Sequence, residues 1–184
     1  DNSGNETTFG TGSLDFDQIN IIASGTFTIA NSVYTDDMVI ASGGQLNLET
    51  GSDVVNSSSD AVISGDGSVN VNANYTVSNT SFGESGNTLG IVNVATGATL
   101  DLTNAAYTNA LNLTGNAILD LESGAQLNST TVKGASDGDG VINVNSTYAG
   151  TYSTVFGTSS NAIGTVNIAG SQIFTLANST TSYI

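Results

Sequence analysis

The chain repeats itself at a spacing of 73 or 74 residues. The dipeptide Phe9-Gly10 recurs 73 residues later as Phe82-Gly83, and 74 residues after that as Phe156-Gly157. Long internal periods are typical of arrays, solenoids and propellers. The period therefore predicts one repeat-built body over residues 1–184, with units at 9–81, 82–155 and 156–184. Because the last unit is incomplete, we expect either a segment of a longer array or an end that a partner covers.

Within each unit, short apolar runs alternate with polar residues at a period of two. One run occurs in all three units, as Ile19-Asn20-Ile21, Val92-Asn93-Val94 and Val166-Asn167-Ile168. Alternation of this kind between Gly, Asn, Asp and Ser predicts half-buried strands. No stretch of ten or more residues has a sustained helical period, and proline is absent. The chain is therefore predicted to be all-β.

Two all-β architectures accommodate many short strands, a sandwich or barrel and a solenoid. The long repeat favours the β-solenoid, or β-helix, with about three coils per repeat and about 24 residues per coil. Apolar residues of successive coils would stack inside, while Asn and Thr line the outside. Gly65-Asp66-Gly67 and its copy Gly138-Asp139-Gly140 are expected at tight turns, since Gly and Asp tolerate left-handed backbone angles.

The charge is strongly one-sided, with a net charge of -15 and Lys133 as the only basic residue. Nucleic acid is excluded as a partner because its binding depends on Lys and Arg. An acidic surface instead suits an extracellular protein in a salty or calcium-containing medium. The chain has no cysteine and therefore no disulfides. It also has no apolar run of about 18 residues, so we expect no membrane insertion of this segment.

The runs at 97–102 and 111–121, with their continuation at 122–127, resemble passenger domains of Gram-negative autotransporter adhesins. Filamentous haemagglutinins and rickettsial outer-membrane antigens share this style of sequence. The resemblance covers most of the chain as pattern and composition, and it includes no translocator domain. It implies a cell-surface β-helix used for adhesion or aggregation, and it transfers no individual functional residue.

The residue types exclude most catalytic constellations. Without His, Cys, Arg or Trp there is no Ser-His-Asp or Cys-His machinery and no zinc site of the usual kind. Polysaccharide lyases of β-helical fold use Lys or Arg, and only Lys133 is available. Carboxylate pairs for glycoside hydrolysis remain possible at Asp120 with Glu122 and at Asp15 with Asp17. The first pair recurs as Asn47 with Glu49, as a polar outer face would, so we predict no enzyme activity.

Calcium is the best ligand hypothesis, since hard cations take carboxylate and carbonyl oxygens. The densest cluster is Asp137-Gly138-Asp139-Gly140, which makes Asp137 and Asp139 the candidate ligands. The alternative is that both are solvated turn residues, because no complete calcium-loop motif is present. Apart from this possible calcium, no cofactor is expected.

Two pairs of tyrosines are related by the repeat, Tyr34 with Tyr107 and Tyr75 with Tyr148. They could rim a contact with a glycan or a protein, or pack at the bases of loops. Tyr152 and Tyr183 lie outside these pairs.

Three functions follow from these patterns. The first is an extracellular structural or adhesive segment of a surface protein, which binds a host surface or glycan receptor or self-associates. The second is a subunit of a homopolymeric surface filament or layer, joined through the unpaired strand edges at the ends of a solenoid. The third, a carbohydrate-active enzyme, is disfavoured by the missing basic residues.

Overall fold

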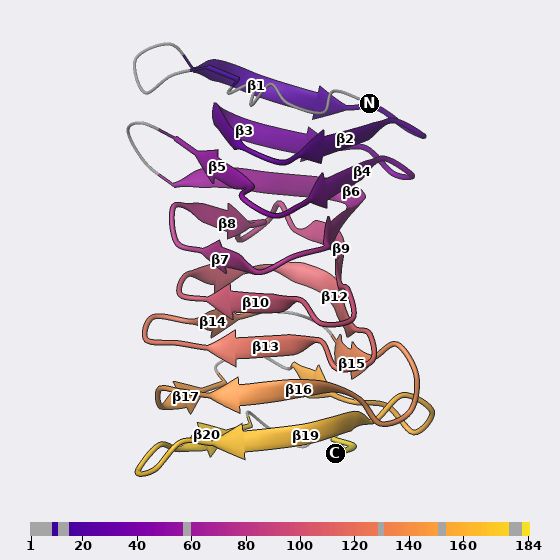
Figure 1. Cartoon of the computed structure of the whole chain (residues 1–184), viewed down its shortest axis with the longest axis vertical. Coiled ribbons are helices and arrows are strands. Elements are labelled where there is room, and N and C mark those ends of the chain that lie inside the picture. Colours follow the sequence, from indigo (N-terminus) through magenta and orange to yellow (C-terminus); the bar gives the residue numbers. More distant parts are fainter. Residues whose placement is uncertain (1–8, 11–14, 57–59, 129–130, 151–153, 177–181) are drawn as a thin grey trace.

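The computed structural model is an all-β solenoid of about seven turns. It describes residues 9–10, 15–56, 60–128, 131–150, 154–176 and 182–184. Strands of successive turns lie one above another along a single axis, with the N-terminal strands at one end and the C-terminal strands at the other (Figure 1). Every strand pair in the three sheets is parallel, which confirms the predicted fold class.

The described strands form three faces, which the chain visits in a fixed order. The first face contains β1 (Phe16–Ile21), the second half of β3 (Ser32–Ile40), the first part of β6 (Ala61–Val71), β8 (Thr80–Phe82), β11 (Ala105–Ala106) and β14 (Gln126–Leu127). The second contains β2 (Thr26–Ile29), β4 (Gln45–Leu48), the rest of β6, β9 (Leu89–Val94), β12 (Thr108–Leu113), β15 (Thr131–Gly134) and β18 (Val155–Phe156).

The third face contains β7 (Tyr75–Val77), β10 (Thr99–Leu102), β13 (Ile118–Leu121), β16 (Asp139–Val144) and β19 (Ile163–Ile168). Two short pairs complete the winding. β5 (Asp53–Val55) pairs with the start of β3 and, from the order of winding, belongs to the third face. β17 (Tyr148–Ala149) pairs with β20 (Phe174–Thr175) and belongs to the first.

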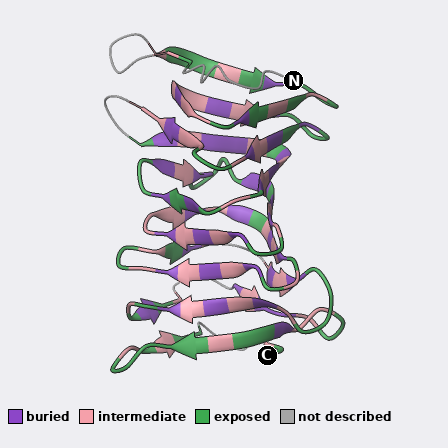
Figure 2. Cartoon of the chain, viewed as in Figure 1, coloured by how far each residue is buried: buried purple, intermediate pink, exposed green. Residues whose placement is uncertain are grey.

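The core is a set of apolar columns that run along the axis. On the second face, each residue of one column pairs with the next, and all are buried: Leu46, Val69, Val92, Leu111, Val132 and Phe156. This column follows from the sequence, because alternate residues of a strand point to the same side of a sheet. Along the middle of the rod, buried and partly buried residues alternate in the strands (Figure 2).

Gly65-Asp66-Gly67, predicted to be a tight turn, instead lies inside β6. Its pairing with β9 shifts register between Gly65 and Ser68, where the strand leaves the first face for the second. The other predicted turn, Gly138-Asp139-Gly140, overlaps the start of β16, which begins at Asp139, and both of its glycines have positive φ.

The sequence repeat advances the chain by three turns and one further face. β1 on the first face becomes β9 on the second face one repeat later, and β19 on the third face after another repeat. The sequence predicted about three coils per repeat, at about 24 residues per coil. Neighbours along a ladder are instead 19 or 23 residues apart in these turns, so one repeat makes more than three turns. Each repeat copy is therefore rotated by a third of a turn relative to the copy before it.

One local motif marks the same point of all three repeats. The backbone N–H groups of Tyr34, Tyr107 and Tyr183 donate to the carbonyl oxygens of Phe9, Phe82 and Phe156, at 2.9, 2.6 and 2.8 Å. The glycine that follows the phenylalanine has φ of 81°, 72° and 72°. Glycine is required there because a Cβ atom at Gly83 would collide with the Tyr107 carbonyl oxygen, and one at Gly157 with that of Tyr183. A shift of 74 residues from Tyr107 leads to Thr181, so the sequence pattern alone did not identify Tyr183 as the third member.

Candidate functional site

The second face carries a ladder of asparagines along the rod. The amide nitrogens of Asn47, Asn70, Asn93 and Asn112 each donate to the side chain one turn before, at distances of 3.4, 2.8, 3.0 and 2.9 Å. The ladder begins at the hydroxyl of Thr28. Stacked amides satisfy one another because each has both a donor and an acceptor.

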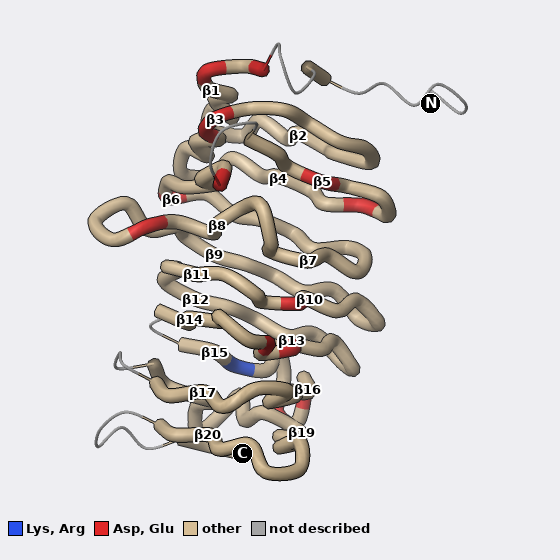
Figure 3. The backbone as a smooth tube through the Cα atoms, turned by 90° about the vertical axis from the view of Figure 1, so that its left-hand side faces the viewer, with Lys and Arg blue, Asp and Glu red and all other residues tan. Residues whose placement is uncertain are grey.

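The asparagine ladder stops beside the only basic residue of the chain. Asn112 pairs in register with Lys133 of β15, and the buried Oδ1 of Asn112 accepts no hydrogen bond. Figure 3 shows this single basic position against acidic residues distributed along the rod. The second face is therefore neutral and amide-lined over its central turns.

The third face carries a corresponding ladder that contains carboxylates. Thr76, Asp101, Asp120, Asn143 and Asn167 follow one another in register. The Thr76 hydroxyl donates to Asp101 (3.1 Å), Asn143 donates to Asp120 (2.7 Å), and Asn167 donates to Asn143 (2.9 Å). Burial raises the pKa of the Asp120 carboxyl above its ordinary value; Asp101 and Glu122 raise it further, while the hydrogen bond from Asn143 lowers it.

The two carboxylate pairs considered for catalysis lie in different settings. Asp120 and Glu122 accept ladder hydrogen bonds from Asn143 and Asn145, at 2.7 and 2.6 Å. The equivalent Glu49 accepts the same bond from Asn72 at 2.6 Å. These side chains hold neighbouring turns together. In the other pair, Asp15 precedes β1 and Asp17 is exposed within it.

The candidate calcium ligands cap backbone groups of their own turn and the next. Asp139 accepts a hydrogen bond from the N–H of Ser136 (3.0 Å), and Asp137 accepts one from the N–H of Ala162 (3.2 Å). Within the described residues, no group of three or more Asp, Glu, His or Cys is placed to hold a metal ion. Calcium binding by this pair remains a prediction.

One of the two repeat-related pairs of tyrosines, Tyr75 with Tyr148, packs inside the rod. Tyr75 and Tyr148 are each 4% exposed. The ring of Tyr75 stacks on Phe82 with centroids 6.0 Å apart, and Tyr148 contacts Phe174 at 5.7 Å. Burial raises the pKa of both phenols to about 12. Tyr75 and Tyr148 therefore pack in the core and do not rim a ligand site. Tyr34 and Tyr107 are half-buried at corners, and Tyr152 lies outside the described residues.

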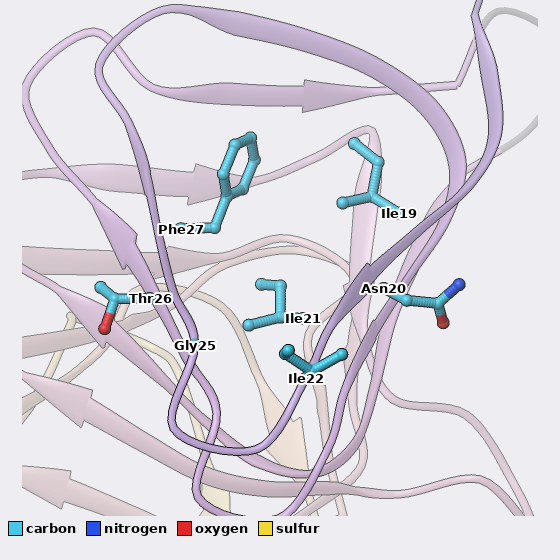
Figure 4. Close-up of a pocket in the computed structure, with 7 residues that line it drawn as sticks. All are labelled: Ile19, Asn20, Ile21, Ile22, Gly25, Thr26 and Phe27. Atoms are coloured by element: carbon cyan, nitrogen blue, oxygen red, sulfur yellow. The ribbon is translucent and has the colours of Figure 1, made fainter.

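The two ends of the rod expose apolar side chains, and two of them, Phe16 and Ile168, pair with residues that are fully buried one turn further in. At the N-terminal end, a hollow of about 210 Å³ is lined by Ile19, Asn20, Ile21, Ile22, Gly25, Thr26 and Phe27 (Figure 4). Figure 4 shows Ile19, Ile21 and Phe27 inside the loop formed by the first turn. Phe9 and Phe16 are each 45% exposed, and Ile22 is 73% exposed.

At the C-terminal end, Ile168, Ile173 and Ile184 are 51%, 61% and 62% exposed. Ile168 lies in β19 and Ile173 directly precedes β20, and β19 is largely exposed (Figure 2). The predicted solenoid implies open ends, but the sequence pattern does not single out these residues. The available signal was the core-type alternation of Ile19 with Ile21 and of Val166 with Ile168, the first and last copies of one repeated run.

No protein-family model, curated protein or solved structure matches this chain. In the part of the chain that the structure describes, no helix has the length and apolar character to cross a membrane.

Proposed function

We propose that this chain is a structural and adhesive rod of an extracellular surface protein, of the β-helical kind that its sequence resembles. The observation that carries the proposal is the division between its interior and its faces. An apolar core runs through the turns, and the second and third faces are covered by hydrogen-bonded Asn, Asp and Thr ladders. Such a rod projects a regular polar surface over its length, and parallel ladders give it stiffness.

The proposed partners are a glycan or other polar surface, bound along the ladders. Amide and hydroxyl groups one turn apart offer donors and acceptors of the type that sugar hydroxyls use. The net charge of -15 keeps rods apart laterally and directs binding toward neutral or cationic surfaces. The proposed role is non-enzymatic, because the carboxylates singled out for catalysis in β13 and just after it support neighbouring turns.

A display experiment tests the adhesive role. The chain is displayed on non-adherent bacterial cells, and attachment to glycan-coated, protein-coated and bare surfaces is measured. Cells that display an unrelated rod of equal length and charge are the control. We expect attachment above this control on at least one surface. Attachment equal to the control on every surface would overturn the adhesive role.

A second candidate function is a subunit of a homopolymeric filament or layer. The exposed apolar residues at both ends favour it, because solenoids need polar terminal repeats to remain soluble as monomers. Cells that display an Ile168→Lys variant separate the two functions in the same assay. Adhesion to a surface should survive this change, whereas cell clumping through the rod ends should not.

A further inference from the structure

The C-terminal end of the rod has an outer strand edge at β19. Among the described strands, β19 pairs along its length only with β16. The next turn has just begun above it, since the N–H of Ile163 donates to the carbonyl of Tyr183 (3.1 Å). This end therefore offers backbone hydrogen-bonding groups together with the apolar side chains of Ile168, Ile173 and Ile184.

Charge favours association at this end. The last acidic residue of the sequence is Asp139, so residues 140–184 contain no charged side chain. All 16 acidic residues lie before this segment, and acidic groups are distributed along the described part of the rod (Figure 3). Two rods side by side would repel each other, whereas a rod approaching the C-terminal end meets a neutral, partly apolar surface.

The two ends of the rod are in phase, which means that the face on which the chain ends is followed, in the order of winding, by the face on which it begins. At the N-terminal end, Phe9 pairs with Val33 on the third face, and β1 and β2 follow on the first and second faces. At the C-terminal end, β19 and β20 occupy the third and first faces, and Tyr183 lies above Phe156 at the end of the second. The chain thus ends after the second face, and Phe9 belongs to the third, which is the next face in the order of winding.

We propose that the polypeptide of residues 1–184 binds a second copy of itself head to tail, with the N-terminal turn of one copy on the C-terminal turn of the next. Because the ends are in phase, a second copy needs only translation along the axis to place β1 over β20 and the Phe9 segment over β19. The parallel ladders of the third and first faces then continue across the junction. The contact rests on the proposed function as a filament subunit, and it specifies polarity, register and the strands that meet.

A contact of this type uses a different surface on each partner, and because it involves translation without rotation it does not close into a ring. Its expected product is a linear filament one rod wide. The apolar side chains brought together are Phe9, Phe16 and Ile22 of one copy and Ile168, Ile173 and Ile184 of the other.

Two end variants test the proposal by complementation in sedimentation-velocity and negative-stain experiments. Ile22→Lys introduces a charge at the N-terminal end and Ile168→Lys at the C-terminal end. Both positions are exposed, so circular dichroism and thermal unfolding should match those of the unmodified chain. We expect the unmodified chain to form filaments as its concentration rises, and each variant to stay monomeric. An equimolar mixture of the two variants should form dimers and nothing larger, through the one junction that remains intact.

The control is Ile91→Lys, which places the same charge at a 41% exposed isoleucine on the side of β9. This variant should still form filaments. If Ile168→Lys lowers the melting temperature, Ile173→Lys tests the same end. Dimers of the Ile22→Lys variant alone would indicate a contact between two C-terminal ends and overturn the head-to-tail arrangement. An unmodified chain that stays monomeric at every concentration would mean that something other than a second copy covers the ends. These results are independent of surface attachment, which tests the adhesive role separately.

Discussion

The middle and the ends of the rod contain the same repeated residues in different surroundings. Ile21, Val94 and Ile168 occupy one position of the repeat, and their side chains are 5%, 0% and 51% exposed. Val94 pairs with Val71 on one side and Leu113 on the other, whereas Ile168 pairs with Val144 alone among described residues. At the C-terminal end a side chain of the core type is therefore exposed for want of a described turn above it, whereas Ile21 stays buried at the N-terminal end although it pairs with Ile40 alone among described residues.

The asparagine at the centre of the same run shows a parallel difference. Asn93 donates to Asn70 and accepts from Asn112, so it links three turns. Asn167 donates to Asn143. Asn20 donates to Gln18 within its own strand (3.2 Å). A ladder residue thus stabilises the rod according to how many turns it joins, and substitutions at matched positions can measure that dependence.

The largest difference is expected for core isoleucines in adjacent layers. Ile142→Ala removes a fully buried side chain in β16 and should lower the free energy of unfolding by about 2–5 kcal/mol. Ile168→Ala in β19 should cost about 1 kcal/mol or less, because half of the side chain is already in water. Urea denaturation of both variants at a concentration where the chain is monomeric measures the contrast. Equal losses would contradict the view that the terminal layer is poorly packed.

The next comparison uses the glycine that follows the repeated phenylalanine. Gly83→Ala places a Cβ atom against the Tyr107 carbonyl at positive φ, within a segment that further turns hold in place. We expect a loss of about 1–3 kcal/mol, which combines backbone strain with the collision. Gly157→Ala has the same φ but meets Tyr183, on which no further described turn packs, so that a smaller rearrangement can relieve the collision. Thermal unfolding should therefore show the greater decrease in Tm for Gly83→Ala, and the reverse order would refute this explanation.

A smaller effect is expected in the asparagine ladder. Asn93→Ala removes two side-chain hydrogen bonds at a half-buried position and should cost about 1–2 kcal/mol. Asn167→Ala removes one exposed bond and should cost about 0.5 kcal/mol. Chemical denaturation monitored by circular dichroism distinguishes them. Similar small losses for both would show that the ladder contributes little beyond its backbone bonds.

The smallest expected effect depends on pH. It belongs to the third-face ladder, which contains carboxylates, and not to the asparagine ladder of the second face. Because the folded-state pKa of Asp120 is raised above its ordinary value of 3.8, the folded protein binds this proton more tightly than the unfolded chain. The contribution of Asp120 to stability is therefore greatest at low pH and is lost as pH rises from 3.8 through the raised pKa. Asp120→Asn should remove this loss and stabilise the rod at neutral pH by about 0.2–1 kcal/mol.

The control for this change is Asp17→Asn, which removes an equal charge at an exposed position of β1. Urea midpoints measured from pH 3 to 7 should converge with the unmodified chain at low pH for Asp120→Asn alone. Parallel curves at all pH values would indicate that Asp120 titrates alike in the folded and unfolded chains.

Much of the fold was predictable from the period and the alternation of residues. Runs such as Leu119-Asp120-Leu121 specify a strand with its apolar side inward, and the long repeat specifies stacking. The three-turns-and-one-face advance was not predictable, because it depends on turns of unequal length whose residues have no regular pattern. The place of Tyr183 was missed for the same reason. The candidate site was predicted only as open ends, since Ile168 has the same sequence surroundings as the buried Val94.

The sequence by itself determined an all-β, strongly acidic repeat protein whose strands each have an apolar and a polar side. These are local properties, since they depend on composition and on the two-residue period of a strand. Only the tertiary structure decided which residues become neighbours across turns. It placed Asn93 inside a ladder, Asp101 beside Asp120, and both ends of the rod in phase. These relations depend on the summed lengths of many turns, a quantity that no single stretch of sequence contains.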